Sequence, residues 1–241
     1  MVKHLEVIYM HRRFQLEILS RHHLEEKQIS VEHLFCFGFS GRNRERALKT
    51  LEEAKASGMT VPQKVPGIWR VSVDLLTNQE SIQVQGENTS GEVEVLIFRY
   101  GKDIFVTVGS DHTDRSLETI SIEKGKQASQ KVYSHGAWQY DEVKDHWDSL
   151  ILRSWIREGN EKIPYQEGTL GDLMTVDDIL GVISRRTGIF PDKTAIFIGS
   201  VPFLDGSNKA SSTFWMELED PVLHRKLSHQ YDVESVPGTY D

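Results

Sequence analysis

The chain has 241 residues, of which 38% are hydrophobic and 27% charged, and its formal net charge is −8 at pH 7. This composition is typical of a globular protein and excludes a disordered one. The acidic balance argues against nucleic acid as a partner, because phosphate binding needs a basic surface. No apolar run approaches the roughly 20 residues that cross a bilayer, so no membrane partner is expected.

The N-terminus has no apolar core of the kind found in signal peptides. The one cysteine, Cys36, lies in the apolar segment 34–37, where a buried and inert thiol is expected and no internal disulfide can form. These features predict a cytoplasmic protein.

The first 60 residues predict a hairpin, a strand and a helix. Short mixed runs at 3–9 and 13–19 favour an opening hairpin, and alternating phenylalanines at 35–39 indicate a strand. Apolar residues recur every three to four positions in 42–57, which predicts a helix that ends at Gly58.

The middle of the chain predicts antiparallel strands. Apolar and polar residues alternate at 68–73, 82–85 and 92–95, and 104–108 is a more buried run. The sequence at 100–103 predicts a tight turn that joins the last two strands into a hairpin.

The last part of the chain predicts a helix at 175–186, with Thr175 as its N-cap, and strands at 194–198 and 213–218. The polar tail after Val233 is expected to be loose. Since no linker is visible, the whole pattern predicts one domain over residues 1–241, mainly β with a few helices (α+β).

Glu92 and Glu94 are two residues apart in a predicted strand, so their side chains would project from the same face. The predicted hairpin brings Asp111 close to both. Neighbouring carboxylates repel each other unless a positive group lies between them, and oxygen ligands favour Mg²⁺ or Mn²⁺, with Ca²⁺ as a further option. The alternative is an exposed strand face followed by a turn aspartate, with no metal.

Three stretches resemble the fumarylacetoacetate hydrolase superfamily. Residues 92–97 resemble its Glu-x-Glu metal strand, 108–118 resemble the segment that carries the third metal ligand, and 189–202 resemble a late stretch that borders the substrate. The similarity covers about 60–220 and leaves 1–60 as a divergent N-terminal part. The resemblance implies the superfamily's mixed β-roll.

The resemblance also implies a metal-dependent hydrolase of a small 2-oxo or 1,3-dicarbonyl acid, acylpyruvate-like, that works through a metal-stabilised enolate. Decarboxylation, hydration and tautomerisation pass through the same intermediate and stay open. A non-catalytic protein that binds small acids is the other alternative. The expected partners are a small carboxylate substrate and a second copy of the chain in a homodimer.

Two residues are predicted to be catalytic. Lys126 resembles the superfamily's lysine that follows the third ligand and would steady the enolate charge, with Lys131 and Lys124 as rivals for this role. His112 directly follows Asp111 and is predicted to face the substrate; the alternative is a surface side chain.

Four further residues are predicted to bind the substrate. Arg115 would hold a carboxylate through its guanidinium fork, unless it pairs with Asp114 or Glu118. Gln127 neighbours Lys126. Gly199 and Ser200 end a predicted strand, where a backbone N–H and a hydroxyl would meet an oxyanion; an ordinary turn is the alternative.

The superfamily's entrance motif is missing from the N-terminal part. Four residues are candidates to replace the His and Glu that activate water in several members: His22, His23, Glu25 and Glu26. The motif Asp-His-Trp-Asp at 145–148 has metal-binding residue types, but a structural or interface role is predicted for it.

Overall fold

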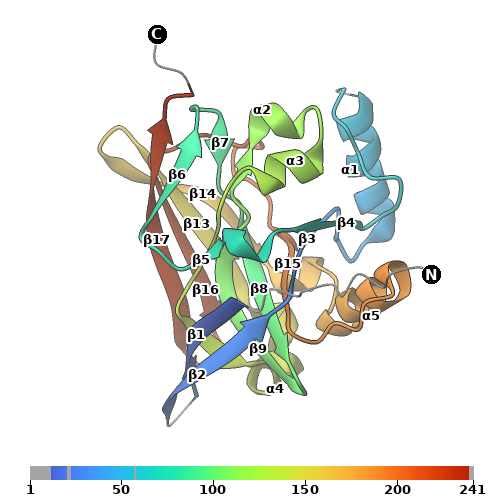
Figure 1. The fold of residues 1–241 in the computed structure, drawn as a ribbon, viewed down its shortest axis with the longest axis vertical. Coiled ribbons are helices and arrows are strands. Elements are labelled where there is room, and N and C mark those ends of the chain that lie inside the picture. The colour runs from blue at the N-terminus through green and yellow to red at the C-terminus, as the bar shows by residue number, and fades with distance from the viewer. Residues whose placement is uncertain (1–11, 21–22, 57, 239–241) are drawn as a thin grey trace, which may run out of the picture.

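The structure is a computed structural model that describes residues 12–20, 23–56 and 58–238. Most of these residues lie in strands, and two curled sheets pack against each other with the helices at their margins (Figure 1). The prediction of a mainly β chain with a few helices is confirmed. Within this part of the chain, no helix combines the length and the apolar character needed to cross a membrane.

The larger sheet has ten strands: β1 (Arg12–Leu19), β2 (Leu24–Val31), β3 (His33–Gly38), β4 (Gly67–Val71), β5 (Leu76–Thr77), β8 (Val93–Tyr100), β9 (Asp103–Ser110), β11 (Lys131–Tyr133), β12 (Gly136–Gln139) and β15 (Thr194–Ser200). Eight of them follow the order β2-β1-β12-β9-β8-β15-β3-β4, and β11 joins β9 to β5. The hairpin β8–β9 therefore lies in the centre of this sheet.

The second sheet has five strands, in the order β14 (Glu161–Thr169), β13 (Ile151–Glu158), β16 (Thr213–Asp220), β17 (Arg225–Val236) and β6 (Ser81–Gln85). A two-stranded ladder joins β7 (Thr89–Ser90) to β10 (Thr113–Asp114). The helices are α1 (Arg44–Ala56), α2 (Arg115–Glu118), α3 (Ile122–Gln127), α4 (Tyr140–Val143) and α5 (Val176–Thr187), with 3₁₀ turns at Val73–Leu75, Lys144–Ser149 and Leu170–Asp172.

Strand β8 shows why the carboxylates face where they do. Val93, Val95 and Ile97 belong to the core between the two sheets, whereas Leu96 and Phe98 belong to the core on the opposite face of the larger sheet. Because successive side chains of a strand alternate, Glu94 shares the face of Leu96 and Phe98. The alternation predicted for this strand is confirmed.

The hairpin β8–β9 has the predicted turn. Tyr100 pairs with Asp103, Gly101 adopts the left-handed φ of +62° that such a tight turn requires, and at the other end Val93 pairs with Ser110. This register puts the start of β8 beside the end of β9.

Two boundary predictions are wrong or lie outside the described residues. The opening hairpin is formed by β1 and β2, and residues 3–9 are not part of the described chain. The tail after Val233 is not loose up to Val236, because residues 234–236 pair in parallel with β6. Earlier in β17, which also pairs with β16, Leu227 and Tyr231 are buried in the core between the sheets.

Candidate metal centre

Three carboxylates converge at the end of the β8–β9 hairpin. One oxygen each of Glu92, Glu94 and Asp111 can be chosen so that all three lie within 4.8 Å of one another. Glu94 belongs to β8, while Glu92 and Asp111 flank the paired ends of the two strands, where the Asp111 N–H donates to the Glu92 carbonyl over 3.0 Å. The convergence expected from the hairpin is therefore present.

The carboxylate of Glu94 is buried, and its Oε2 accepts a hydrogen bond of 2.8 Å from the backbone N–H of Gly199. Burial raises the pKa of Glu94 well above its ordinary value, and the neighbouring charge of Asp111 raises it further. A buried acid with this environment gains from a cation placed against it.

Asp111 is held by two buried lysines. Lys126 contacts Oδ2, and the Lys131 Nζ lies 2.9 Å from Oδ1. Burial alone would raise the pKa of Asp111, but the two ammonium groups outweigh it and hold this pKa well below its ordinary value. Asp111 Oδ1 thus has the Lys131 ammonium as an ion-pair partner.

Glu92 is the most exposed of the three, and the guanidinium of Arg115 faces it with Nη2 3.6 Å from Oε1. Arg115 is itself buried: its Nε donates to the Ser90 hydroxyl over 2.7 Å and its Nη1 to Glu118 over 2.8 Å. The pairing with Glu118, which was the alternative for Arg115, is therefore present. Its contacts favour a role in positioning Glu92, and they leave little of the fork for a substrate.

His112 does not offer a free ring nitrogen. Its Nδ1 lies 3.0 Å from the Tyr231 hydroxyl and its Nε2 2.9 Å from the Thr89 hydroxyl, and the side chain is buried. Burial and the nearby positive charges of Lys131 and Arg115 lower the pKa of His112 to about 3. The ring is neutral and fully bonded, which argues against the predicted catalytic role.

The predicted substrate-binding residues lie in three different places. Gln127 is exposed on α3, and its Oε1 accepts from the Ser72 N–H over 2.9 Å, so it is not part of the centre. The Gly199 N–H is taken by Glu94. The Ser200 hydroxyl accepts from the Gln166 amide over 2.6 Å and donates to the Val93 carbonyl, which fixes the start of β8.

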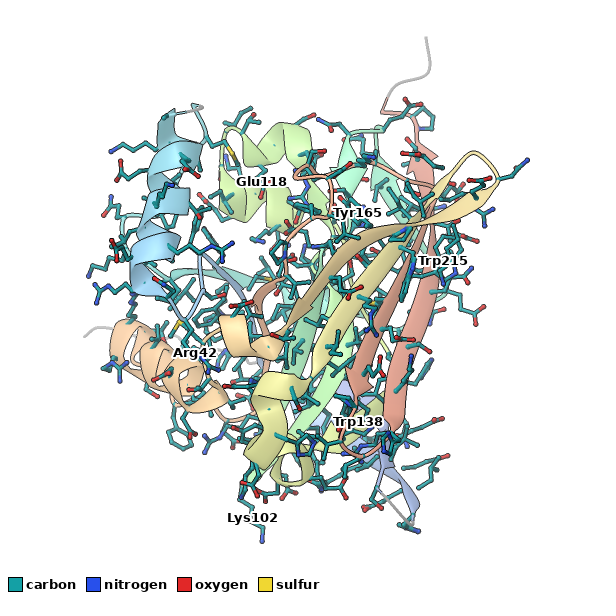
Figure 2. The ribbon with its side chains drawn as sticks, turned by 180° about the vertical axis from the view of Figure 1, so that it is seen from behind. Arg42, Lys102, Glu118, Trp138, Tyr165 and Trp215 are labelled. Atoms are coloured by element: carbon teal, nitrogen blue, oxygen red, sulfur yellow. The ribbon has the colours of Figure 1, made fainter. Side chains whose placement is uncertain are left out.

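The described candidates for the missing His and Glu are not at the centre. On β2, which carries Glu25 and Glu26, Lys27 pairs with Asp103 at the turn end of the β8–β9 hairpin, the end opposite the carboxylates. His23 lies one residue before this strand, and His22 is outside the described residues. Figure 2 shows the two ends, with Lys102 at the turn and Glu118 beside the centre.

Trp69 is a neighbour of the centre that the sequence patterns do not single out. The Lys126 Nζ lies 5.5 Å from the centre of its ring. The ring lies against Gly38 and Gly67, where a Cβ would overlap it. These two glycines, paired across β3 and β4, are the one sequence signal for an aromatic ring at this place.

The motif at 145–148 has structural contacts. Arg42 holds Asp148 through two bonds of 2.7 Å, Trp147 is buried in the core, and the His146 Nε2 lies 3.0 Å from Asp220. These contacts agree with the structural role predicted for the motif.

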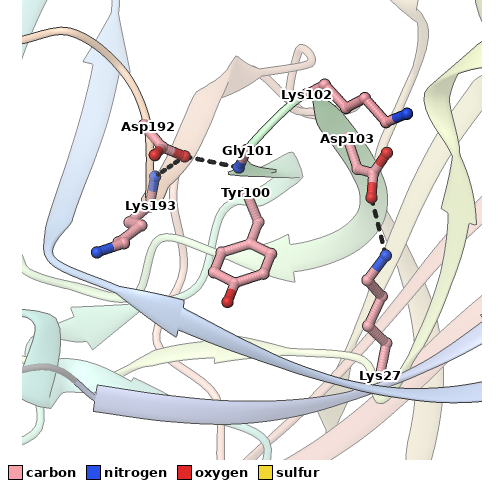
Figure 3. Close-up of a pocket in the computed structure, with 7 residues that line it drawn as sticks. All are labelled: Lys27, Tyr100, Gly101, Lys102, Asp103, Asp192 and Lys193. Carbon is pink, nitrogen blue, oxygen red and sulfur yellow. Dashed lines mark hydrogen bonds and ion pairs between the residues drawn. The ribbon is translucent and has the colours of Figure 1, made fainter.

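Two surface cavities lie away from the carboxylates. One, of about 440 Å³, is at the turn of the β8–β9 hairpin (Figure 3). There Lys27 pairs with Asp103 and the Gly101 N–H donates to Asp192, so the polar groups of this cavity bind one another.

The second cavity, of about 550 Å³, lies on the outer face of the five-stranded sheet around Trp155 and Trp215, whose rings the Lys162 ammonium covers. Neither cavity is lined by a member of the carboxylate cluster.

The residues of the cluster fit a hard divalent ion. The donor set is oxygen only, and buried Glu94 has no cationic group in direct contact among the residues that the structure describes. Carboxylate oxygens are the ligands that Mg²⁺, Mn²⁺ and Ca²⁺ prefer. The arrangement is therefore compatible with metal binding.

The sequence matches the model of one family, DUF2848, described as proteins of unknown function, over residues 37–231. A comparison with curated proteins gives no match.

Solved structures with a similar fold include several enzymes. A 2-keto-3-deoxyarabinonate dehydratase has a TM-score of 0.63 at 16% identity, with 86% of this chain and 75% of that chain covered. Its complex with magnesium and 2,5-dioxopentanoate gives 0.60, also at 16% identity, with 85% and 73% covered.

Two further structures extend this comparison. The fumarylacetoacetate hydrolase of psychrophilic Exiguobacterium antarcticum has a TM-score of 0.57 at 12% identity, with 85% of this chain and 75% of that chain covered. The 4-oxalocrotonate decarboxylase of Pseudomonas putida G7, complexed with calcium and acetate, gives 0.54 at 10% identity, with 84% and 76% covered. At these identities the likeness shows the fold, which is that of fumarylacetoacetate hydrolase.

Proposed function

Because the chain belongs to the DUF2848 family and folds like enzymes of 2-oxo acids, we propose that it is a metal-dependent enzyme acting on a small 2-oxo acid. The metal ligands would be Glu92, Glu94 and Asp111, and the metal Mg²⁺ or Mn²⁺, with Ca²⁺ as an option. The proposal includes membership of the fumarylacetoacetate hydrolase superfamily, for which the fold-level likeness is the support.

The observation that carries the proposal is the convergence of three carboxylate oxygens within 4.8 Å at a place where two of the three acids are fully buried. Buried carboxylates that repel each other cost free energy unless a cation compensates them. Asp111 already has Lys126 and Lys131 as partners, but among the described residues no cationic group is in direct contact with buried Glu94. Burial of Glu94 therefore argues against a solvated strand face and favours a metal ion as its partner.

The residues around the three acids would keep them in place. Gly199 orients Glu94, Arg115 faces Glu92, and Lys126 contacts Asp111. A divalent ion held there would act as a Lewis acid on the 2-oxo and carboxylate oxygens of a bound acid. Lys126, beside the same ligands, would add a fixed positive charge that stabilises negative charge developing on the substrate.

Hydrolysis of an acylpyruvate-like acid stays the leading proposal for the reaction, with decarboxylation, hydration and tautomerisation on the same site as alternatives. All of them require a proton to be moved at a defined atom, and His112 has neither nitrogen free for it. This observation also favours a second candidate function, a protein that binds a small acid without converting it.

The test has two stages on the wild-type chain. Mn²⁺ binding is measured by electron paramagnetic resonance, with Glu94→Gln as the matched variant; the proposal expects one site per chain in the wild type and none in the variant. The metal-loaded protein is then assayed with an acylpyruvate, oxaloacetate and a 2-keto-3-deoxy sugar acid. Turnover of one of them supports the enzyme, metal and acid binding without turnover supports the second candidate, and absence of Mn²⁺ binding rejects both forms of the proposal.

A further inference from the structure

Lys131 is a second buried cation at the three carboxylates, beyond the lysine that the sequence pattern favours. We infer that Lys131 couples the binding of a metal ion to the binding of an anion at this centre, so that a divalent cation binds tightly only together with a carboxylate anion. This inference rests on the proposed function, because it takes the three acids as metal ligands.

The position of Lys131 is fixed by the sheet. It is the first residue of β11, whose next residue, Val132, pairs with Ser110 immediately before Asp111. The side chain is fully buried; its ammonium lies 2.9 Å from Asp111 Oδ1 and donates to the carbonyl oxygen of His112. A lysine enclosed in this way cannot turn to solvent when the charge beside it changes.

The charges of the centre can be counted from its contacts. With all four carboxylates ionised, as metal binding to Glu94 requires, the side chains of the centre carry a net charge of −1: Glu92, Glu94, Asp111 and Glu118 against Arg115, Lys126 and Lys131. A divalent ion would change this net charge to +1. A singly charged 2-oxo acid would then bring it to zero.

The count assigns a specific effect to Lys131. Without its charge the four carboxylates would face two cations, and the divalent ion alone would neutralise the centre. With Lys131 present, the ion leaves an uncompensated positive charge in a buried place, which is costly until an anion enters. The anion and the ion therefore each strengthen the binding of the other by the same factor, as linkage requires.

A purely structural role for Lys131 predicts something different. If Lys131 only fixes the orientation of Asp111, its loss weakens Mn²⁺ binding equally with and without the anion. If Lys131 couples the binding of cation and anion, its loss strengthens the binding of Mn²⁺ alone and removes the increase in Mn²⁺ affinity that the anion provides. The ratio of the two affinities separates these roles, and the affinity by itself does not.

The experiment measures the Mn²⁺ affinity of the full chain by electron paramagnetic resonance, without pyruvate and with saturating pyruvate. The wild type is expected to bind Mn²⁺ about tenfold or more tightly with pyruvate, within the usual range of coupling. Lys131→Met and the polar neutral Lys131→Gln are expected to bind Mn²⁺ alone more tightly than the wild type, with the gain from pyruvate reduced to about threefold or less. Lys124→Met, at an exposed position of α3, is the control and should keep the wild-type ratio.

If the wild type binds Mn²⁺ equally tightly with and without pyruvate, the inference is wrong. This measurement does not depend on the folding of any variant. A ratio in Lys131→Gln equal to that of the wild type overturns it as well. If the wild type binds no Mn²⁺ with or without pyruvate, the proposed metal function fails first, and the inference fails with it.

Discussion

The backbone N–H of Gly199 donates a hydrogen bond of 2.8 Å to Oε2 of Glu94. The sequence predicts that this N–H binds a substrate oxyanion, but in the structure it orients a buried carboxylate of the centre. Gly199 has a φ of +116°, and an added Cβ would overlap the hydroxyl of Ser40. Glycine is therefore required here for two independent reasons, and the end of β15 becomes part of the support of the centre.

Gly199→Ala should destabilise the protein and weaken metal binding together. The strained φ and the overlap with Ser40 are expected to cost roughly 2–6 kcal/mol of unfolding free energy, since each such feature costs about 1–3 kcal/mol. Urea unfolding and Mn²⁺ titration measure the two effects. Gly101→Ala is the matched control, because its φ is also positive but open space surrounds it. Equal Mn²⁺ affinities in wild type and Gly199→Ala would show that Glu94 does not depend on this bond.

Glu94→Gln should stabilise the metal-free protein and abolish its response to metal. The folded-state pKa of Glu94 is raised by burial, so the unfolded chain ionises this group first and the fold loses stability as pH rises above the unfolded pKa of about 4.5. The neutral amide avoids this loss and still accepts the Gly199 N–H. The difference in unfolding free energy between variant and wild type should grow as pH rises from 4.5 towards the raised pKa.

Saturating Mn²⁺ should make the wild type more stable than Glu94→Gln, because a ligand that binds only the folded state stabilises it. The wild type is expected to gain stability and the variant to gain none. The loss of Mn²⁺ affinity in Glu94→Gln should exceed the roughly 10–100-fold that removal of an outer-shell partner costs. Glu161→Gln, at an exposed position of β14, serves as the control. Thermal denaturation at several pH values, with and without Mn²⁺, gives all of these quantities.

The sequence predicts the hairpin well because the signals for it are local. Alternation along β8 and β9 and the turn at Gly101 fix the register, and the register alone brings Glu94 beside Asp111. The boundaries are less predictable. β3 ends at Gly38 because Phe39 takes a left-handed φ of +53°, and nothing in the alternating pattern marks this change.

The contacts of the individual site residues could not be predicted, since they come from distant parts of the chain. The Gly199 N–H meets Glu94 across 105 positions, and Tyr231 meets His112 across 119. Patterns within a short window carry no information on such pairs. For the same reason residues 234–236 are predicted to be loose, although they pair in parallel with β6.

Arg115→Met should destabilise the fold by about 3–5 kcal/mol, because it leaves buried carboxylates without their cation. Arg115 bonds Glu118 over 2.8 Å and faces Glu92, and it is itself buried. The double variant Arg115→Met/Glu118→Gln should recover part of the loss, whereas Arg70→Met, at an exposed position of β4, should change stability by less than about 0.5 kcal/mol. If Arg115 instead only bound a substrate carboxylate, Arg115→Met would keep the wild-type unfolding free energy and raise KM alone.

His112 should make the metal-free protein sensitive to mild acid. Its folded-state pKa is about 3, below the unfolded value of about 6.5, so the unfolded chain binds the extra proton and stability is lost as pH falls from 6.5 towards 3. At about 1.36 kcal/mol per pH unit, the loss from pH 7 to pH 5 is about 2 kcal/mol. In His112→Gln this loss of about 2 kcal/mol between pH 7 and pH 5 should disappear. His135→Gln, at an exposed position, should lose as much stability as the wild type. Urea unfolding at the two pH values measures the difference. Equal acid sensitivity of His112→Gln and wild type would mean that the ring is charged in the folded state, and that its bonds to Tyr231 and Thr89 do not hold it neutral.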